Sequence, residues 1–250
     1  MSKIVERTLD LLELFAEEKR PLSLSDIAQL LKIPVSSCHD VLRAMQARGY
    51  LYEIAPRVGY YPTLRVHSLS KETVDNDPLL MRTEQLLRSL RDTLEESVLL
   101  SKVAGLRAFY LLVFDSSHPL RVRMKVGDSV RSLHGSSAGK ALLGSLDKRA
   151  LVAFLKSAKL APLTKQTITS GAALRKDIEL GRKRGWYLSR EESLAAVTSI
   201  SVAFRWTRSV YIATIAGPSS RLDRKLENTA SLLTDICHRL ENQSGPPKPP

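Results

Sequence analysis

The 250-residue sequence has little cysteine: it contains only Cys38 and Cys237, far apart in the chain. Such a pair matches neither a disulfide-stapled domain nor the clustered ligands of a zinc site. No stretch approaches the roughly 18 consecutive apolar residues that a membrane-spanning helix needs. The first residues carry acids among their leucines and no small-residue cleavage site, which is not the pattern of a secretory signal. We therefore expect a cytoplasmic protein with no membrane partner, no metal and no cofactor.

Catalytic signatures are also scarce. The five histidines are scattered, and neither a His-x-x-x-His metal pair nor a Gly-x-Ser-x-Gly nucleophile elbow occurs. The stretch from Gly135 to Ala141 approximates a phosphate-binding loop. It lacks one residue between its glycines, and no Ser or Thr follows Lys140 to hold magnesium. His134 beside serines is the one arrangement that favours catalysis, and a structural histidine is the simpler interpretation. The sequence thus predicts that the protein is not an enzyme.

The charge is unevenly distributed along the chain. The formal net charge is +12, with 43% hydrophobic and 26% charged residues, which is typical of a globular protein. Residues 1–75 hold ten basic and ten acidic side chains, so the whole excess lies in residues 76–250, where 28 basic side chains face 16 acidic ones. A basic chain favours an anionic partner. Net charge alone does not locate a nucleic-acid surface near the N-terminus.

The local pattern near the N-terminus is more informative. Apolar residues recur at helical spacing over residues 3–17. Ser23 and Asp26 have the spacing of a capping box for a short second helix. Pro34 then opens a third helix that ends near Gly49, a residue typical of helix C-termini. Two helices joined by a turn of three or four residues form a helix-turn-helix, whose second helix enters the major groove of DNA.

Two short strands, 50–53 and 60–64, follow the third helix and predict a β-hairpin wing. Residues 1–66 are therefore interpreted as a winged helix-turn-helix domain. Between residues 32 and 66 five basic side chains face two acidic ones, which supports DNA binding. A solvated polar face on a small helical domain is the alternative. The predicted DNA-contacting residues are Ser25, Val35, Ser36, Ser37, His39, Arg43, Arg57 and Tyr60.

The rest of the chain predicts an α+β domain. Residues 67–97 are expected to form a polar linker and a linker helix that starts at Pro78. Residues 98–241 follow as short β-prone runs and helical stretches, which favours a sheet packed by helices. Residues 242–250, rich in proline, have nothing to bury and are interpreted as a disordered tail. The expected strands are 98–103, 107–114, 120–124, 186–189, 199–204 and 210–215, and the expected helices are 138–146, 148–156, 173–184 and 222–240.

Four stretches, taken in order, resemble the IclR family of bacterial transcription regulators. The first, residues 24–51, contains the Pro-Val-Ser-Ser-Cys-His start of the third helix; the second, residues 124–143, contains Gly-Ser-Ser-Ala-Gly-Lys. The third, residues 185–200, contains Glu-Glu, and the fourth, residues 213–221, contains Gly-Pro and a following Arg. The resemblance covers most of the chain. It implies a homodimer or tetramer on a double-stranded DNA operator, and a second domain of the GAF-like α/β effector-binding type.

The resemblance also implies a pocket for a small-molecule effector. By the family's pattern its residues are Leu133, Ser137, Ala138, Ser189, Ser199, Thr214 and Ala216. Ser189 stands where relatives often have an acid, Ser199 where some have cysteine, and Ala216 where serine is common; Ala196 replaces a usual glycine. A small-residue loop that leads into a helix N-terminus suits a carboxylate. Residues 121–190 hold 16 basic and four acidic side chains. We therefore expect a small organic acid.

These features predict a sequence-specific DNA-binding transcriptional regulator whose DNA binding is modulated by a small carboxylic acid. The alternatives are a DNA-binding protein with a vestigial, non-sensing second domain, and an enzyme that transforms a small molecule. Asp40 departs from the family's usual arginine, so it either points away from DNA or changes the choice of operator. The sequence does not distinguish a repressor from an activator, and it does not identify the effector.

Overall fold

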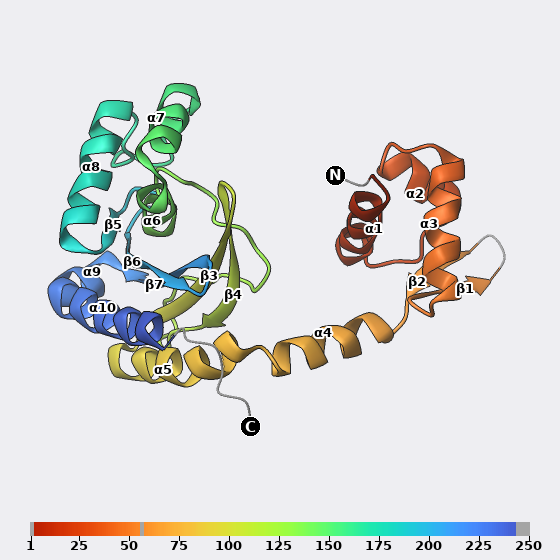
Figure 1. Cartoon of the computed structure of the whole chain (residues 1–250), viewed down its shortest axis with the longest axis horizontal. Coiled ribbons are helices and arrows are strands. Elements are labelled where there is room, and N and C mark those ends of the chain that lie inside the picture. Colours follow the sequence, from red (N-terminus) through yellow and green to blue (C-terminus); the bar gives the residue numbers. More distant parts are fainter. Residues whose placement is uncertain (1–2, 56–57, 244–250) are drawn as a thin grey trace. The chain divides into compact units, whose positions relative to one another are not determined.

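The computed structural model describes residues 3–55 and 58–243, and the chain forms two compact units that meet between Asp77 and Pro78 (Figure 1). Each unit has a hydrophobic core of its own. Within the described residues, no helix is both long enough and apolar enough to cross a membrane.

The first unit consists of three helices, a hairpin and a fourth helix. The elements are α1 (Lys3–Glu18), α2 (Leu24–Leu30), α3 (Val35–Ala47), β1 (Leu51–Ala55), β2 (Gly59–Pro62) and α4 (Arg65–Asp75). The predicted capping box is confirmed: the Ser23 hydroxyl accepts from the Asp26 amide, and the Asp26 carboxylate accepts from the Ser23 amide. Lys32 has a left-handed backbone in the turn between α2 and α3. The winged helix-turn-helix order is therefore as the sequence predicts.

The core of this unit holds the wing against the helices. Leu11, Phe15, Ile27, Leu42 and other buried side chains of α1–α3 pack with Leu51 of β1. The segment before α2 also joins the hairpin, because Leu22 and Tyr60 exchange two backbone hydrogen bonds of 3.1 and 2.8 Å. The wing is thus fixed to the start of the helix-turn-helix by backbone pairing as well as by packing.

The linker differs from the prediction of a polar stretch followed by one linker helix. Residues from Arg65 to Asp75 form α4, which buries none of its residues. The helix that starts at Pro78 is α5 (Pro78–Leu94), and five of its six buried residues, including Leu87, Leu90 and Leu94, belong to the core of the second unit. In packing terms α5 is the first helix of the second unit, because its apolar stripe is covered by the sheet of that unit.

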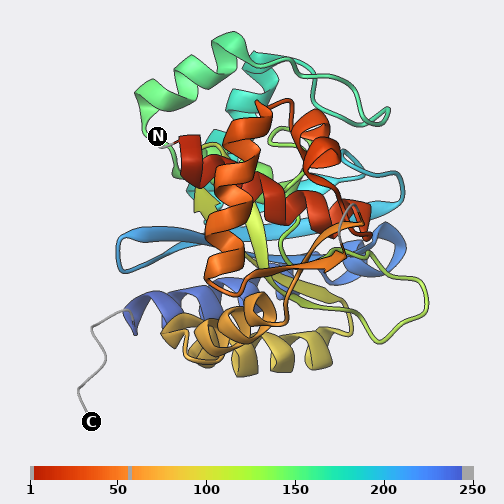
Figure 2. The same ribbon diagram turned by 90° about the vertical axis from the view of Figure 1, so that its right-hand side faces the viewer.

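The second unit is a five-stranded antiparallel sheet between two layers of helices. In sheet order the strands are β4 (Arg107–Phe114), β3 (Ser97–Ala104), β7 (Ser209–Pro218), β6 (Val197–Trp206) and β5 (Tyr187–Arg190). The helices after α5 are α6 (Ser137–Ser145), α7 (Lys148–Ser157), α8 (Gly171–Arg184), α9 (Ser219–Leu222) and α10 (Leu226–Asn242). Figures 1 and 2 show α5 and α10 on one face of the sheet and α6, α7 and α8 on the other.

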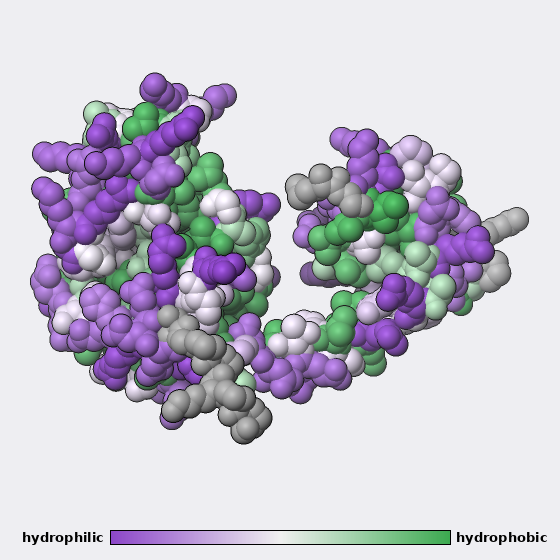
Figure 3. All heavy atoms as spheres, viewed as in Figure 1, coloured by the Kyte–Doolittle hydropathy of each residue, from purple (hydrophilic) through white to green (hydrophobic). Residues whose placement is uncertain are grey.

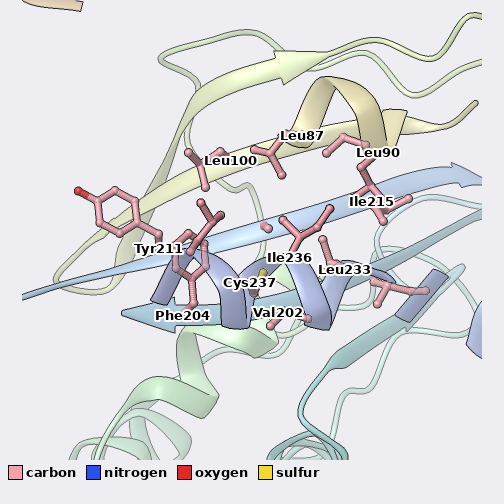
Figure 4. Close-up of a cluster of buried hydrophobic side chains, with 14 of the residues drawn as sticks. Leu87, Leu90, Leu100, Val202, Phe204, Tyr211, Ile215, Leu233, Ile236 and Cys237 are labelled. Atoms are coloured by element: carbon pink, nitrogen blue, oxygen red, sulfur yellow. The ribbon is translucent and has the colours of Figure 1, made fainter. Parts of the chain in front are cut away.

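Alternating side chains of each strand supply these two layers. Leu100, Val202, Phe204 and Ile215 point to the α5–α10 face, where they meet Leu87, Leu233 and Cys237 (Figure 4). Their neighbours Leu99, Ala203 and Ala216 belong to the opposite cluster, beneath α6 and α8. The period of two along the strands therefore produces two separate cores.

Two sequence predictions need correction here. Residues 120–124 form no strand, because they belong to an irregular segment that leaves the sheet after β4. The single helix expected over 222–240 is divided into α9, a short 3₁₀ turn at Asp223–Lys225, and α10. The predicted tail from residue 242 lies mostly outside the described residues; Asn242 still belongs to α10.

Candidate DNA-binding face and effector cavity

One side of α3 presents half of the eight residues that the sequence predicts to contact DNA. Val35, Ser36, His39 and Arg43 are exposed, while the core side carries Cys38, Val41, Leu42 and Met45. Successive residues turn by about 100° around a helix, so these four lie within one exposed arc of about 100° beside the core side. A helix that follows a turn, buried on one side and polar on the other, has the form that enters a major groove.

The other predicted DNA contacts lie in different surroundings. Ser25 is exposed on α2, with its hydroxyl 3.1 Å from the Ser23 hydroxyl. Tyr60 is half-buried and packs against the core of the unit. Arg57 lies outside the described residues. Ser37 and Asp40 line a groove on the flank of α3, and the Asp40 carboxylate lies 3.9 Å from the His39 ring nitrogen.

That groove has a volume of about 920 Å³ and lies between α1, α3 and α4 of the first unit. Ile4, Leu69 and Val74, which line it, are 65%, 51% and 49% exposed. Ile4 and Leu9, two of the apolar residues that recur at helical spacing over residues 3–17, are both exposed. The groove is an apolar surface that the described part of this unit leaves uncovered.

A second, smaller cavity of about 60 Å³ lies in the second unit, between the sheet and the start of α6. Five of the seven predicted effector residues line it: Ser137, Ala138, Ser199, Thr214 and Ala216. None of its lining residues is charged, so the basic excess of residues 121–190 is not concentrated here. The remaining lining residues are Leu99, Tyr110, Val122, Met124, Ser136, Ser193, Leu194 and Val197.

Buried hydroxyl groups form a chain along one wall of this cavity. The Ser137 hydroxyl donates to Ser199, and its oxygen also lies 2.8 Å from that of Ser201. The Ser201 and Thr214 oxygens are likewise 2.8 Å apart. Strand register produces the chain, because Ser201 pairs with Thr214 while Ser199 pairs with Ala216. Hydroxyls donate or accept as required, so this wall can adapt to a polar ligand.

Tyr110 was missed by sequence reasoning, and so were the apolar lining residues. Tyr110 lies on β4, on the same face as Leu99 of the neighbouring β3. Burial raises the pKa of the Tyr110 phenol, so its hydroxyl stays protonated and can donate to a ligand. The alternation of inward- and outward-facing side chains along β3 and β4 could have indicated Leu99 and Tyr110. Val122 and Met124 could not be found in this way, because their segment has no regular structure.

The two other predicted effector residues do not line the cavity. Ser189 donates a 2.6 Å hydrogen bond to the Gly135 carbonyl and so fixes the loop before α6. Leu133 packs against the core on the α6 side of the sheet. A Cβ atom at Gly139 would lie 2.4 Å from the Leu133 Cα, so this loop can pass α6 only where glycine stands. Ser189 and Leu133 therefore do not contact the cavity but help to position the loop before α6, whose end lines it.

The Gly139-Lys140 pair, which in the sequence approximates a phosphate-binding loop, has a structural role. The Lys140 side chain is fully buried, and its ammonium lies 2.6 Å from Glu192 Oε1, 2.8 Å from Asp177 Oδ2 and 3.0 Å from the Leu188 carbonyl. Three acceptors therefore match the three N–H donors of the ammonium. The contacts join α6 to α8, to β5 and to the segment after β5.

That segment, residues 191–196, forms one side of the cavity through Ser193 and Leu194. It begins and ends in left-handed backbone, with φ of 57° at Glu191 and 59° at Ala196. This conformation costs a residue with a side chain about 1–2 kcal/mol. It gives a physical reason why a glycine is usual at position 196 in the family that the sequence resembles. Thr164 and Thr167 donate to the carbonyls of Glu191 and Glu192 and hold the segment from outside.

His134 is held in place through both of its ring nitrogens. Its side chain is buried, with one ring nitrogen 2.9 Å from the Ala161 carbonyl and the other 3.2 Å from the Ser132 hydroxyl. Both nitrogens are thus used in positioning the loop before α6. Within residues 3–55 and 58–243, no group of three or more His, Cys, Asp or Glu side chains is arranged to hold a metal ion.

Comparison with known proteins finds two family models, which together cover most of the chain. Residues 4–54 match the IclR helix-turn-helix domain, and residues 71–240 match the domain described as bacterial transcriptional regulator IclR C-terminal. The HTH-type transcriptional repressor AllR of Escherichia coli strain K12 is 27% identical over 247 residues, covering 98% of this chain and 91% of its own. The glycerol operon regulatory protein of Streptomyces griseus is 30% identical over 225 residues, covering 87% and 85%.

A solved structure shares the fold over nearly the whole length. An IclR homolog from Microbacterium hydrocarbonoxydans, complexed with 4-hydroxybenzoate, superimposes with a TM-score of 0.78 at 19% identity, covering 97% of this chain and 99% of that one. The named relatives are a transcriptional repressor and an operon regulatory protein. The chain belongs to the IclR family of DNA-binding bacterial transcriptional regulators.

Proposed function

We propose that the protein is a ligand-responsive repressor that binds a specific operator through α2, α3 and the wing. A small organic acid, held in the cavity beside α6, shifts its affinity for that operator. The observation that carries the proposal is the hydroxyl-lined cavity at the start of α6, in the same chain as an exposed recognition helix. The repressor role is supported by the name of the relative AllR.

The operator part of the proposal depends on the exposed arc of α3. Arg43 is the long donor of this arc, and an arginine that reads guanine contributes about 1–3 kcal/mol of discrimination. We expect Arg43→Ala to weaken binding to the operator about 10- to 100-fold at fixed salt. Fluorescence anisotropy on the DNA upstream of the protein's own gene, against a scrambled duplex, measures this change. Arg20→Ala, which removes the same charge outside α3, is the control. Equal losses in the two variants would contradict the assignment.

The effector part depends on what the cavity can bind. The first amides of α6 and the hydroxyls of Tyr110 and Ser199 are donors suited to a carboxylate, since Ser199 accepts from Ser137 at the end of the hydroxyl chain and its own proton stays available. The apolar lining suits the carbon skeleton of the acid. A cavity of about 60 Å³ holds only a few water molecules, whereas ligand pockets usually exceed about 300 Å³. Binding therefore requires the irregular segments 122–124 and 193–196 to move outward. This movement supplies two states that a ligand can bind unequally.

Titration calorimetry with a panel of small organic acids tests this part. We expect saturable heat from at least one acid, and the same acid should change operator affinity. Ala216→Leu fills the cavity and should abolish both responses, while operator affinity without ligand stays within about threefold. Ser231→Leu, at an exposed position of α10, is the matched control. No heat from any acid would favour a domain that no longer senses.

Pairing of two protomers is supported by the apolar groove of the first unit. An amphipathic helix such as α4 that buries nothing in its own chain gains stability only from a partner. We infer that a second copy covers the groove formed by α1, α3 and α4, which would give the two-fold symmetry that a palindromic operator needs. Sedimentation of Leu69→Glu against the wild type tests this: the variant should be monomeric at concentrations where the wild type is dimeric.

A further inference from the structure

The net charge of the second unit is concentrated on one of its two helical layers. Residues 147–185, which contain α7, α8 and the loop between them, hold ten Lys and Arg against three Asp and Glu, a net of +7. The opposite layer, α5 and α10, holds four basic against five acidic side chains, a net of −1. The unit is therefore electrically polarised across its sheet. Figure 3 shows hydrophilic side chains gathered over α7 and α8.

All three acidic residues of this layer are already occupied. The Asp147 carboxylate caps α7 by accepting from the Ala150 amide at 2.7 Å. Asp177 is paired with the buried Lys140, and Glu179 with Arg175 on its own helix. Apart from the electrostatic interaction of Glu179 with Lys183, one turn along α8, no acid in the layer is thus left to neutralise the remaining basic side chains.

Seven basic side chains of the layer are exposed and have no ion-pair or hydrogen-bond partner among the described residues. Arg182 and Arg184 are excluded, because they donate to backbone carbonyls and serve the fold. On each helix two of the seven stand seven residues apart, which places them on one side of that helix. The seven, here named the α7–α8 basic surface, are Lys148, Arg149, Lys156, Lys159, Lys165, Lys176 and Lys183.

We propose that the α7–α8 basic surface binds the phosphate backbone of duplex DNA without reading its sequence. Flexible lysines predominate, and these act as point charges toward phosphate rather than as forked readers of base edges. The chain binds DNA through its first unit, so a duplex is the polyanion present at the highest effective concentration. The surface is separate from the recognition helix and from the effector cavity, and the proposal does not depend on the nature of the effector.

Salt-dependent binding of the full chain to a long random-sequence duplex tests the proposal. Lys156, Lys159, Lys176 and Lys183 are changed together to Gln, which keeps good helix formers at exposed positions. A control variant changes Arg205, Arg208, Arg224 and Arg239 to Gln, removing the same charge from other exposed sites of the unit. Both variants have the same net charge, so only the position of the charge differs.

We expect the surface variant to bind the random duplex at least ~10-fold more weakly at low salt. The slope of log affinity against log salt should fall by about 2–4, since each lost phosphate contact removes about 0.9. The control should keep nearly the wild-type slope. Equal slopes in the two variants would overturn the proposal, and so would a surface variant that loses binding to phosphatidylserine vesicles while it keeps its DNA binding.

Chemical acetylation of the wild type gives a reading that needs no variant. A saturating random duplex should protect Lys156, Lys176 and Lys183 from the reagent. It should leave Lys125, an exposed residue of the irregular segment after β4, unprotected. If DNA changes the acetylation of none of these four lysines, the result contradicts a contact at this surface.

Discussion

Lys140→Met is expected to lower the free energy of unfolding of the second unit by about 3–5 kcal/mol, because it leaves the buried Glu192 carboxylate and the partly buried Asp177 carboxylate without their cation. Methionine keeps the length and packing of the stem, so the loss reports the ammonium itself. Folded proteins are stable by only about 5–15 kcal/mol, so a large part of the margin disappears. Urea unfolding of the full chain measures the effect.

Two comparisons separate this charge effect from a general effect of methionine. Lys176→Met, on the exposed side of α8, should change the stability by no more than about 0.5 kcal/mol. Glu192→Gln keeps Asp177 as a partner for Lys140 and should cost clearly less than the loss of the lysine. A Lys140→Met protein as stable as the Lys176→Met protein would show that the buried cluster contributes no net stability.

The pH dependence of the free energy of unfolding, compared between the wild type and Lys140→Met, supplies a further check. Burial, the largest influence on Glu192, raises the pKa of its carboxyl above the ordinary value of 4.5. The folded protein then holds this proton more tightly than the unfolded chain does. The stability that Glu192 contributes is therefore full below about pH 4.5 and declines as the pH rises through the folded pKa. Without Lys140 this pKa rises further, so the destabilisation by Lys140→Met should be larger at pH 8 than at pH 5. Glu192→Gln should remove the decline.

Local signals in the sequence were sufficient for most of the first unit. Three of these signals depend only on residues close together in the sequence: the capping box of Ser23 and Asp26, the turn before Pro34, and the change of period after Gly49. Helix α4 was missed because it has few large apolar residues and buries none of them. A helix that packs on a core shows an apolar stripe in its sequence, and α4 lacks the large apolar residues that would make such a stripe evident.

The cavity could be predicted only in part, because its contacts are distant in the chain. The family's pattern pointed to Ser137, Ser199 and Thr214, and these three do line it. The hydroxyl chain between them passes through Ser201, which only strand register reveals. In the same way the ion pairs of Lys140 with Asp177 and Glu192 join residues of three elements, and no local spacing indicates them.

Gly59→Ala is expected to abolish operator binding by displacing the wing. A Cβ atom at Gly59 would lie 2.4 Å from the carbonyl carbon and oxygen of Leu22, and the φ of 117° is rarely adopted by residues with a side chain. The strand β2 must therefore move away from the segment before α2. The two hydrogen bonds between Leu22 and Tyr60 are lost with that movement, and we expect a cost of about 2–5 kcal/mol in the first unit.

Gly49→Ala is the matched control for this change. Gly49 also has a positive φ, of 72°, but its nearest neighbour to an added Cβ is the Arg65 side chain at 3.9 Å. It should therefore cost only the backbone term of about 1–2 kcal/mol and leave the wing in place. Anisotropy on the operator should show more than ~10-fold weaker binding for Gly59→Ala than for Gly49→Ala. In both variants the second unit should keep its wild-type urea transition, because its core shares no residues with that of the first. Wild-type operator affinity in Gly59→Ala would mean that the wing contributes neither to the fold of the first unit nor to its contact with DNA.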